Sequence, residues 1–387
     1  MSSSYPSPPR RVRVVTVVDT LDSGGAEKFA LLIATRLDPE RFESTLCVSR
    51  WPPQDSVAST QALEQLDEAG VRFLALGRSA KLDVWVWTRL ARFLRRERVH
   101  VLHAHKFGSN VWGTLMARMA GVPVVLAHEH TWSYDGQPLR RFLDREVVAR
   151  AADRFIAISR EDQRRMIEVE RIDPGRTLFI PIGLPTLPTL VEHDVRAELA
   201  IEPGAPVIGA VALLRPQKAL DVLLHATALL AAEWPSLQVL LVGQGPERQS
   251  LERLARSLGV EQAVRFLGYR TDVAAVLGAL DVAVCCSDFE GTPLAVLEYM
   301  DATLPVVATA VGGVPDLIEP GVHGLLVDPQ DPPALAQAIA ELLRDPERRR
   351  SMGARGRQRR RNEFGIDVLI HRLEDLYLEL LAQRGWH

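Results

Sequence analysis

The chain has 387 residues, of which 47% are hydrophobic and 25% charged, and its formal net charge is −3. This composition is typical of a globular protein, and the length predicts two domains. The balanced charge gives no overall attraction to nucleic acid, and no run reaches the roughly 20 apolar residues that span a bilayer, so we expect a cytoplasmic protein, at most peripheral to a membrane, with no nucleic-acid partner.

Residues 1–10 are rich in Ser and Pro, which predicts a disordered tail. After them, short apolar runs alternate with amphipathic helical segments such as Ala26–Leu37, Asp83–Arg96 and Ser109–Ala120. The predicted strands are Val12–Val18, Ser44–Val48, Val71–Leu76, Val99–Ala104, Val122–Ala127 and Arg154–Ile158. Apolar strands that alternate with helices predict a parallel, doubly wound sheet.

The pattern pauses at Ile180–Pro185, where prolines and a glycine break any periodic element, and then repeats. The second set of predicted strands is Val207–Leu213, Leu237–Val242, Val264–Leu267, Val282–Cys286, Val306–Thr309 and Leu325–Val327. We therefore expect two α/β Rossmann-like domains, residues 11–185 and 186–365, that face each other across a cleft. A last helix in residues 366–387 follows the second domain, and we consider that it docks back on the first.

Three cysteines, Cys47, Cys285 and Cys286, lie in apolar runs that are typical of strands. An odd number in a chain of this length argues against a disulfide framework, and the spacing fits no zinc site, so we expect reduced core cysteines.

The segment Ser287–Leu294, followed by Glu298, is the strongest functional signal. A buried strand ends before it, and a helix is expected to start with Thr292 as N-cap and Pro293 in its first turn. The positive end of that helix would face the carboxyl edge of the sheet, where anionic diphosphates bind. Glu290 and Glu298 could accept hydrogen bonds from hydroxyls of one ligand; the alternative is a capping carboxylate and an exposed helical Glu.

Two cations, Arg215 and Lys218, follow the strand Val207–Leu213 and precede a predicted helix, Ala219–Ala231. Fixed cations at this edge would stabilise the charge that a diphosphate leaving group acquires. Lysine is rare in the chain, with only Lys28, Lys81, Lys106 and Lys218, so a lysine in a motif is notable. The alternative is a pair of solvated surface cations.

A glycine pair, Gly24 and Gly25, stands between the first strand and the first helix in the segment Asp22–Glu27. It allows close approach of a ligand to backbone N–H groups. This segment lacks the third glycine of the dinucleotide fingerprint, and Gly243-Gln244-Gly245-Pro246-Glu247-Arg248 fails because Arg248 stands at the third position. A Rossmann dehydrogenase is therefore disfavoured.

Histidines gather at two predicted strand ends, His103 and His105 after one strand and His128 and His130 after the next. We expect structural roles for His103 and His128, and contacts to sugar or acceptor for His105 and His130. No Asp-x-Asp pair or supporting carboxylate accompanies them, so we expect no metal site.

Together these residues resemble the large retaining glycosyltransferase family 4, which has a two-Rossmann-domain (GT-B) architecture. The resemblance runs through Gly24–Glu27, Ile180–Gly183, Arg215 with Lys218, Gly243–Pro246, Val264–Gly268, Glu290 with Glu298, and Pro305–Gly313. Each block is weak alone, but their order and spacing are specific.

The resemblance implies a role for each motif residue in binding a nucleotide diphosphate sugar. Glu298 would hold the ribose, Arg215 and Lys218 the diphosphate, and Glu290 the transferred hexose. Backbone at Gly291, Thr292, Pro293 and Leu294 would contact phosphate and sugar, Gly24 and Gly25 the distal phosphate, His130 the sugar, and the stretch from Phe266 to Tyr269 the base. In this family the leaving phosphate oxygen usually takes the acceptor proton, so the resemblance implies no cofactor, metal or dedicated base.

The sequence departs from the family at Ala219, where glycine is usual after the lysine, and at Tyr299, Asp301 and Thr303 behind the donor. None of these changes removes a charged group that the chemistry needs.

The acceptor is expected to be a glycan or a lipid-linked molecule. Arg89, Arg92 and Arg96 share one helical face, which predicts contact with an anionic membrane; a solvated face is the equal alternative. A sugar phosphorylase, a nucleotide-sugar epimerase and a non-catalytic nucleotide-sugar-binding protein are the competing functions.

Overall fold

We describe the protein from a computed structural model, which describes residues 11–21, 24–50, 57–80, 83–130, 137–186 and 193–386. The predicted tail, residues 1–10, and Asp22 and Ser23 of the first glycine motif lie outside these residues. The chain divides into two compact units: unit 1 comprises residues 1–183 and 366–387, and unit 2 comprises residues 184–365.

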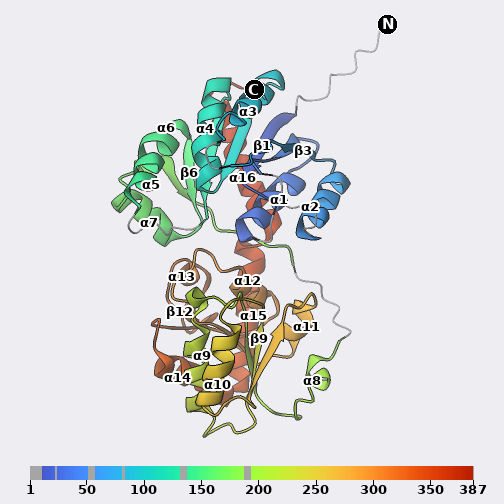
Figure 1. The fold of residues 1–387 in the computed structure, drawn as a ribbon, viewed down its shortest axis with the longest axis vertical. Coiled ribbons are helices and arrows are strands. Elements are labelled where there is room, and N and C mark those ends of the chain that lie inside the picture. The colour runs from blue at the N-terminus through green and yellow to red at the C-terminus, as the bar shows by residue number, and fades with distance from the viewer. Residues whose placement is uncertain are drawn as a thin grey trace. The chain divides into compact units, whose positions relative to one another are not determined.

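Unit 1 is built on a seven-stranded parallel sheet in the order β3-β2-β1-β4-β5-β6-β7. Figure 1 shows this unit in blue to green, with α16 in red. Its strands are β1 (Val12–Val18), β2 (Phe42–Val48), β3 (Arg72–Ala75), β4 (Val101–His105), β5 (Val124–Glu129), β6 (Arg154–Ala157) and β7 (Thr177–Phe179). Its helices are α1 (Gly25–Arg36), α2 (Val57–Glu68), α3 (Trp87–Arg96), α4 (Phe107–Ala120), α5 (Pro138–Leu143), a π-helical turn (Asp144–Val148), α6 (Ala149–Ala151), α7 (Arg160–Glu168), a 3-10 turn (Pro174–Arg176) and α16 (Ile366–Ala382).

The last helix, α16, belongs to unit 1, where it packs against α1 and β5. The buried Glu374 accepts a hydrogen bond from the backbone N–H of Asp38 at 2.7 Å, and it pairs with Arg41 at 3.3 Å. Tyr377 reaches the buried face of the sheet and hydrogen-bonds His103 at 2.7 Å. The helix therefore completes the core of the unit in which the chain begins.

Unit 2 repeats the topology with a six-stranded parallel sheet in the order β10-β9-β8-β11-β12-β13. The strands are β8 (Val207–Val211), β9 (Gln238–Val242), β10 (Val264–Gly268), β11 (Val282–Cys285), β12 (Val306–Thr309) and β13 (Gly324–Val327). The helices are α8 (Val195–Glu198), a 3-10 turn (Pro216–Lys218), α9 (Leu220–Leu230), α10 (Arg248–Ser257), α11 (Val273–Gly278), α12 (Leu294–Asp301), α13 (Val314–Leu317), α14 (Pro332–Arg344) and α15 (Pro346–Glu363).

Helices cover both faces of the unit 2 sheet. Helices α9, α10 and α14 pack together on one face (Figure 1), and α11 and α12 pack on the other. Both sheets have the doubly wound strand order, so the prediction of two Rossmann-like units is confirmed. The three cysteines are buried and form no disulfide.

The strand order places one topological switch point in each unit. In unit 1 it lies between β1 and β4, and in unit 2 between β8 and β11. The loops that follow these neighbouring strands diverge at the carboxyl edge of the sheet, which is where open α/β sheets bind their ligands.

Candidate functional site

At the unit 2 switch point, the loop after β8 carries Lys218 and the loop after β11 carries Glu290. Lys218 Nζ lies 2.5 Å from Glu290 Oε1, which also accepts a hydrogen bond from Ser287 Oγ at 2.6 Å. The Lys218 side chain is 23% exposed, so the cation remains accessible to a ligand. The Glu290 side chain is 7% exposed, and the hydrogen bond from Ser287 fixes its carboxylate.

One backbone and one side-chain hydrogen bond fix the two loops to each other. The N–H of Asp288 donates to the carbonyl of Gln217 at 2.9 Å, and Gln217 Nε2 donates to the carbonyl of Phe289 at the same distance. Lys218 and Glu290 are therefore held in place by the loops themselves and not only by their own charges.

A glycine pair after β12 supports the Glu290 loop. Gly312 has a φ of +52°, and a Cβ there would lie 1.7 Å from the Glu290 carbonyl oxygen. The next N–H, of Gly313, donates to the carbonyl of Gly291 at 2.7 Å. Only glycine allows this approach, which explains the first glycine of the Gly312-Gly313 motif structurally.

A cavity of about 50 Å³ opens beside the pair, between the ends of β8 and β11, with Leu294 and Tyr299 on its wall. Beyond Gly209 the two strands no longer pair. The Tyr299 hydroxyl accepts a hydrogen bond from the N–H of Val211 at 2.7 Å and so fills the gap that the diverging strands leave. The larger side chain at this position thus closes the floor of the site.

The helix that faces this site is α12, and its start differs from the prediction. Its N-cap is Pro293, not Thr292, and the helix begins at Leu294, without a side-chain cap. The reason is that Pro293 adopts the extended conformation typical of an N-cap residue. Likewise, Ala219 is the N-cap of α9 and not its first residue, with a φ of +45° that suits the glycine usual in the family.

Two predicted donor-site residues, Arg215 and Glu298, do not line the cavity beside the Lys218–Glu290 pair. Arg215 is exposed and lines a separate hollow with Asp221 and Glu247. Glu298 lies one turn into α12 and is half-buried. Their assignment to ribose and diphosphate stays a prediction.

The stretch from Phe266 to Tyr269, predicted to contact the base, contains one packed and one exposed aromatic residue. Phe266 packs against the core with Arg248 over its ring at 5.8 Å, whereas Tyr269 is 72% exposed.

Gly243 and Gly245 allow close packing, because a Cβ at either position would lie within about 2.2 Å of a backbone oxygen of Ala212 or Leu214. This contact accounts for the second glycine motif without a ligand.

At the unit 1 switch point, the structure shows a second Lys–Glu pair. Glu27 Oε1 lies 2.6 Å from Lys106 Nζ, and the Glu27 carboxylate folds back over the start of α1. A Cβ on Gly24 would lie 2.3 Å from Glu27 Oε2, so Gly24 makes room for this carboxylate, and Gly25 begins the helix.

Lys106 has a φ of +71° and a ψ of 155°, a conformation almost confined to glycine. Backbone strain of this kind is concentrated at functional sites. We did not predict this pair; the signal available in the sequence was the scarcity of lysine.

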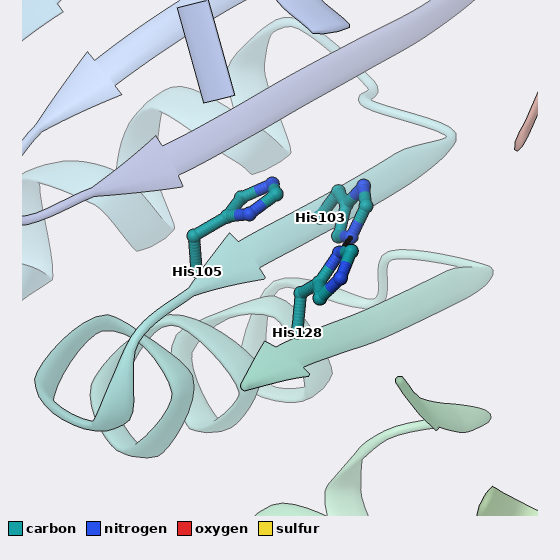
Figure 2. A group of neighbouring side chains, drawn as sticks. All are labelled: His103, His105 and His128. Atoms are coloured by element: carbon teal, nitrogen blue, oxygen red, sulfur yellow. Dashed lines mark hydrogen bonds between the residues drawn. The ribbon is translucent and has the colours of Figure 1, made fainter. Parts of the chain in front are cut away.

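The four histidines are buried in unit 1, and three of them lie within strands and not in loops. His103 and His105 lie within β4, His128 lies within β5, and only His130 follows its strand. Figure 2 shows the rings of His103 and His128 side by side, joined by a hydrogen bond from neighbouring strands. His105 is fully buried and hydrogen-bonds His130 at 2.9 Å, and the contact of these two residues with sugar or acceptor stays a prediction.

Burial keeps these imidazoles neutral. It lowers the pKa of His103 to about 3, and burial together with the neighbouring His103 and Lys106 lowers the pKa of His130 to about 3. For His105 and His128, burial and the adjacent rings hold the pKa well below its usual value.

One ring nitrogen from each of His103, His105 and His128 lies within 4.8 Å of the other two, a spacing that a metal ion could bridge. The rings already have other partners: His103 Nε2 pairs with His128 Nδ1 at 3.2 Å, and His103 Nδ1 pairs with Tyr377. A buried dication would also need compensating charge, which metal-bound histidines usually obtain from second-shell carboxylates or carbonyls. Nε2 of His105 and Nε2 of His128 have no hydrogen-bond partner among the described residues, so the absence of a metal stays a prediction.

Comparison with known proteins follows the two units. Residues 191–359 match the model described as Glycosyl transferases group 1, and residues 23–186 match that described as Glycosyltransferase Family 4. The chain is 33% identical to a D-inositol 3-phosphate glycosyltransferase of Thermobispora bispora, over 94% of this chain and 92% of the relative. A protein of the same name from Salinispora tropica is 30% identical over 97% and 86% of the two chains.

Among solved structures, Anabaena HepE in complex with UDP matches with a TM-score of 0.82 over 95% of this chain and all of the other, at 21% identity. At that identity the match shows the fold. No helix among the described residues is long and apolar enough to cross a membrane.

Proposed function

Because this chain belongs to glycosyltransferase family 4, we propose that it transfers a hexose-type sugar from a nucleotide diphosphate donor to an acceptor hydroxyl, with retention of anomeric configuration and without a metal. The observation that carries this proposal is the Lys218–Glu290 pair at the unit 2 switch point, beside the uncapped start of α12. A cation and a free helix N-terminus suit a diphosphate, and a buried carboxylate suits sugar hydroxyls.

For the donor we propose a UDP-sugar as the first compound to test, since Anabaena HepE was solved with UDP and with UDP-glucose. In the proposed complex Lys218 contacts the diphosphate, Glu290 the sugar hydroxyls and Glu298 the ribose.

In the proposed reaction, the bond between the anomeric carbon and the leaving phosphate oxygen breaks as the acceptor oxygen bonds to the same face of that carbon. The acceptor proton passes to the leaving phosphate oxygen. Lys218 and the N–H groups at the start of α12 stabilise the negative charge that develops on the diphosphate, because both are fixed before the reaction begins.

For the acceptor we propose a polyol phosphate, with D-inositol 3-phosphate as the first compound to test because several relatives carry that name. In unit 1, Lys106 offers a cation for a phosphate, and Glu27 offers a carboxylate for hydroxyls. A glycan or a lipid-linked molecule is the other acceptor class to screen.

The test compares Lys218→Ala and Glu290→Gln with Lys28→Ala, which removes an exposed lysine without a described partner. We expect each site variant to lower donor turnover by about 10²- to 10³-fold, the usual effect of losing one fixed transition-state contact. Lys218→Ala should weaken UDP binding more than Glu290→Gln, because only Lys218 meets the diphosphate. Wild-type turnover in both variants, with the fold intact, would refute the site.

The same assay distinguishes the competing reactions. Transfer that persists in EDTA supports a metal-independent mechanism, and the anomeric configuration of the product, read by NMR, reports retention. An epimerised donor or a requirement for inorganic phosphate would replace the transfer proposal with an epimerase or a phosphorylase, and donor binding without any turnover would indicate a binding protein.

We further propose peripheral contact with an anionic membrane through α3. Arg92 is exposed, and Trp85, just before the helix, is 79% exposed. Arg89 and Arg96 are already engaged, Arg89 with the Leu76 carbonyl and Arg96 with Glu97, which reduces the charge available. Co-sedimentation with anionic vesicles at low salt tests this contact, and Trp85→Ala with Arg92→Ala should abolish it.

A further inference from the structure

The chain passes between the two units at two places, and these lie side by side in unit 2. It enters unit 2 at Leu184 and leaves it at Gly365. Leu184 and Gly365 form a parallel β-bridge, and the N–H of Leu184 donates to the carbonyl of Phe364 at 3.3 Å. We call these two places the crossings. Because they are hydrogen-bonded to each other, a displacement of one also moves the other.

A buried arginine on α15 holds the first crossing. Arg360 is only 2% exposed, and its guanidinium donates to the carbonyl of Leu184 at 2.7 Å, to the carbonyl of Pro185 and to Thr186 Oγ1 at 3.4 Å. The guanidinium reaches these three consecutive residues through two nitrogens held in a rigid plane, whereas a lysine would offer a single nitrogen.

The same guanidinium faces the end of α12. Arg360 lies 3.8 Å from Asp301, whose side chain is 1% exposed and which is the last residue of that helix. About two turns before Arg360, Gly353 lets α15 pass close to the chain that follows α12: a Cβ there would lie 2.0 Å from the carbonyl oxygen of Thr303. Glu298 stands one turn before Asp301 on α12.

We propose that Arg360 is a positioning residue for glycosyl transfer, which couples the crossing at Leu184–Thr186 to α12 and thereby sets the position of Glu298. The assignment of Glu298 to the donor rests on the proposed function; the coupling itself does not. Asp301, one of the departures from the family, supplies the carboxylate that balances the buried cation.

The first test is hydrogen exchange of the full-length chain, which needs no substrate. Arg360→Lys keeps the charge near Asp301 but cannot satisfy all three acceptors, so we expect exchange at least tenfold faster both at Leu184 and in residues 294–301. Arg361→Ala is the matched control, since it removes the exposed neighbouring arginine, and should exchange like the wild type. Faster exchange at Leu184 with no change in residues 294–301, or no change at either place, would overturn the coupling.

The second test measures UDP binding by calorimetry. We expect Arg360→Lys to weaken UDP binding at least fivefold, because α12 is no longer fixed. Ile339→Val, at a fully buried position of α14, controls for simple loss of stability and should leave UDP affinity unchanged. Equal affinities in the two variants would mean that Arg360 only stabilises the fold.

Failure of the proposed donor and failure of the proposed coupling give different results. If the wild type does not bind UDP, the proposed donor is wrong while the exchange result still decides the coupling. Asp301→Asn provides a second variant if Arg360→Lys does not fold: it leaves the Arg360 contacts to Leu184 and Pro185 in place, and should speed exchange in residues 294–301 without affecting Leu184. Unchanged exchange in residues 294–301 of that variant would also overturn the proposal.

Discussion

The buried histidines make the stability of unit 1 depend on pH, and His103 allows the size of the effect to be worked out. Its pKa is lowered to about 3 in the folded protein and returns to an ordinary value of about 6.5 on unfolding. Below pH 6.5 the unfolded chain therefore binds a proton that the folded chain does not, and stability falls as the pH falls. Linkage gives a loss of about 2 kcal/mol from this residue between pH 8 and pH 5.

The perturbation is His103→Asn, whose amide can replace Nδ1 toward Tyr377 but does not titrate. The variant is less stable at pH 8 because His128 loses its partner, yet it should lose about 2 kcal/mol less than the wild type between pH 8 and pH 5. Groups elsewhere in the chain, such as Asp144 with its pKa raised to about 9 by burial and by nearby Glu129 and Glu170, titrate in both proteins and cancel in this difference.

Hydrogen exchange of the β4 amides, corrected for the intrinsic rate at each pH, reports the local free energy of opening. His371→Asn, at an exposed position on α16, is the control and should follow the wild type. An equal loss in wild type and His103→Asn would mean that His103 accepts a proton in the folded state, and the assignment of a neutral buried core would then be wrong.

Three further predictions concern single backbone and side-chain contacts. Gly312→Ala should destabilise unit 2 by about 2–4 kcal/mol in urea unfolding. The control Gly321→Ala, also at positive φ but with nothing within 4 Å of the added carbon, should cost about 1 kcal/mol. Similar costs for the two variants would refute a clash between the added carbon at position 312 and the Glu290 carbonyl. Tyr299→Phe should lower the stability of unit 2 by about 1–2 kcal/mol, measured in the same way, and an unchanged midpoint would show that water replaces the hydroxyl at Val211. Lys106→Gly should be more stable than Lys106→Ala by about 1 kcal/mol, the reverse of the usual order within helices, and a more stable alanine variant would refute backbone strain at this position.

Much of the fold followed from the sequence, because buried parallel strands are apolar on both faces and stand out as short runs. The strand β1, predicted over Val12–Val18, has those bounds in the structure. The strand positions of the histidines were predicted wrongly. The predicted strands ended at Ala104 and Ala127 because histidine is usually polar. In the structure, neutral imidazoles that pair with one another continue the buried strands.

The sequence predicted only those residues of the candidate site that stand directly after a recognisable strand. Lys218 and Glu290 each follow a recognisable strand, so their common location could be inferred from the carboxyl edge of a parallel sheet. The Glu27–Lys106 pair could not, because its members are 79 residues apart in the sequence and meet only through the adjacency of β1 and β4. The left-handed conformation of Ala219 was equally hidden, since alanine rarely adopts it.

The place of α16 has a consequence for synthesis of the protein. Unit 2 is continuous in the sequence, but unit 1 includes the last residues, from Ile366 onward. A ribosome therefore makes most of unit 1 first, yet that unit cannot gain the contacts of Glu374 and Tyr377 until the whole of unit 2 has been synthesised. The half that is translated earliest is thus the last to mature, and nascent chains should depend on chaperones over that interval.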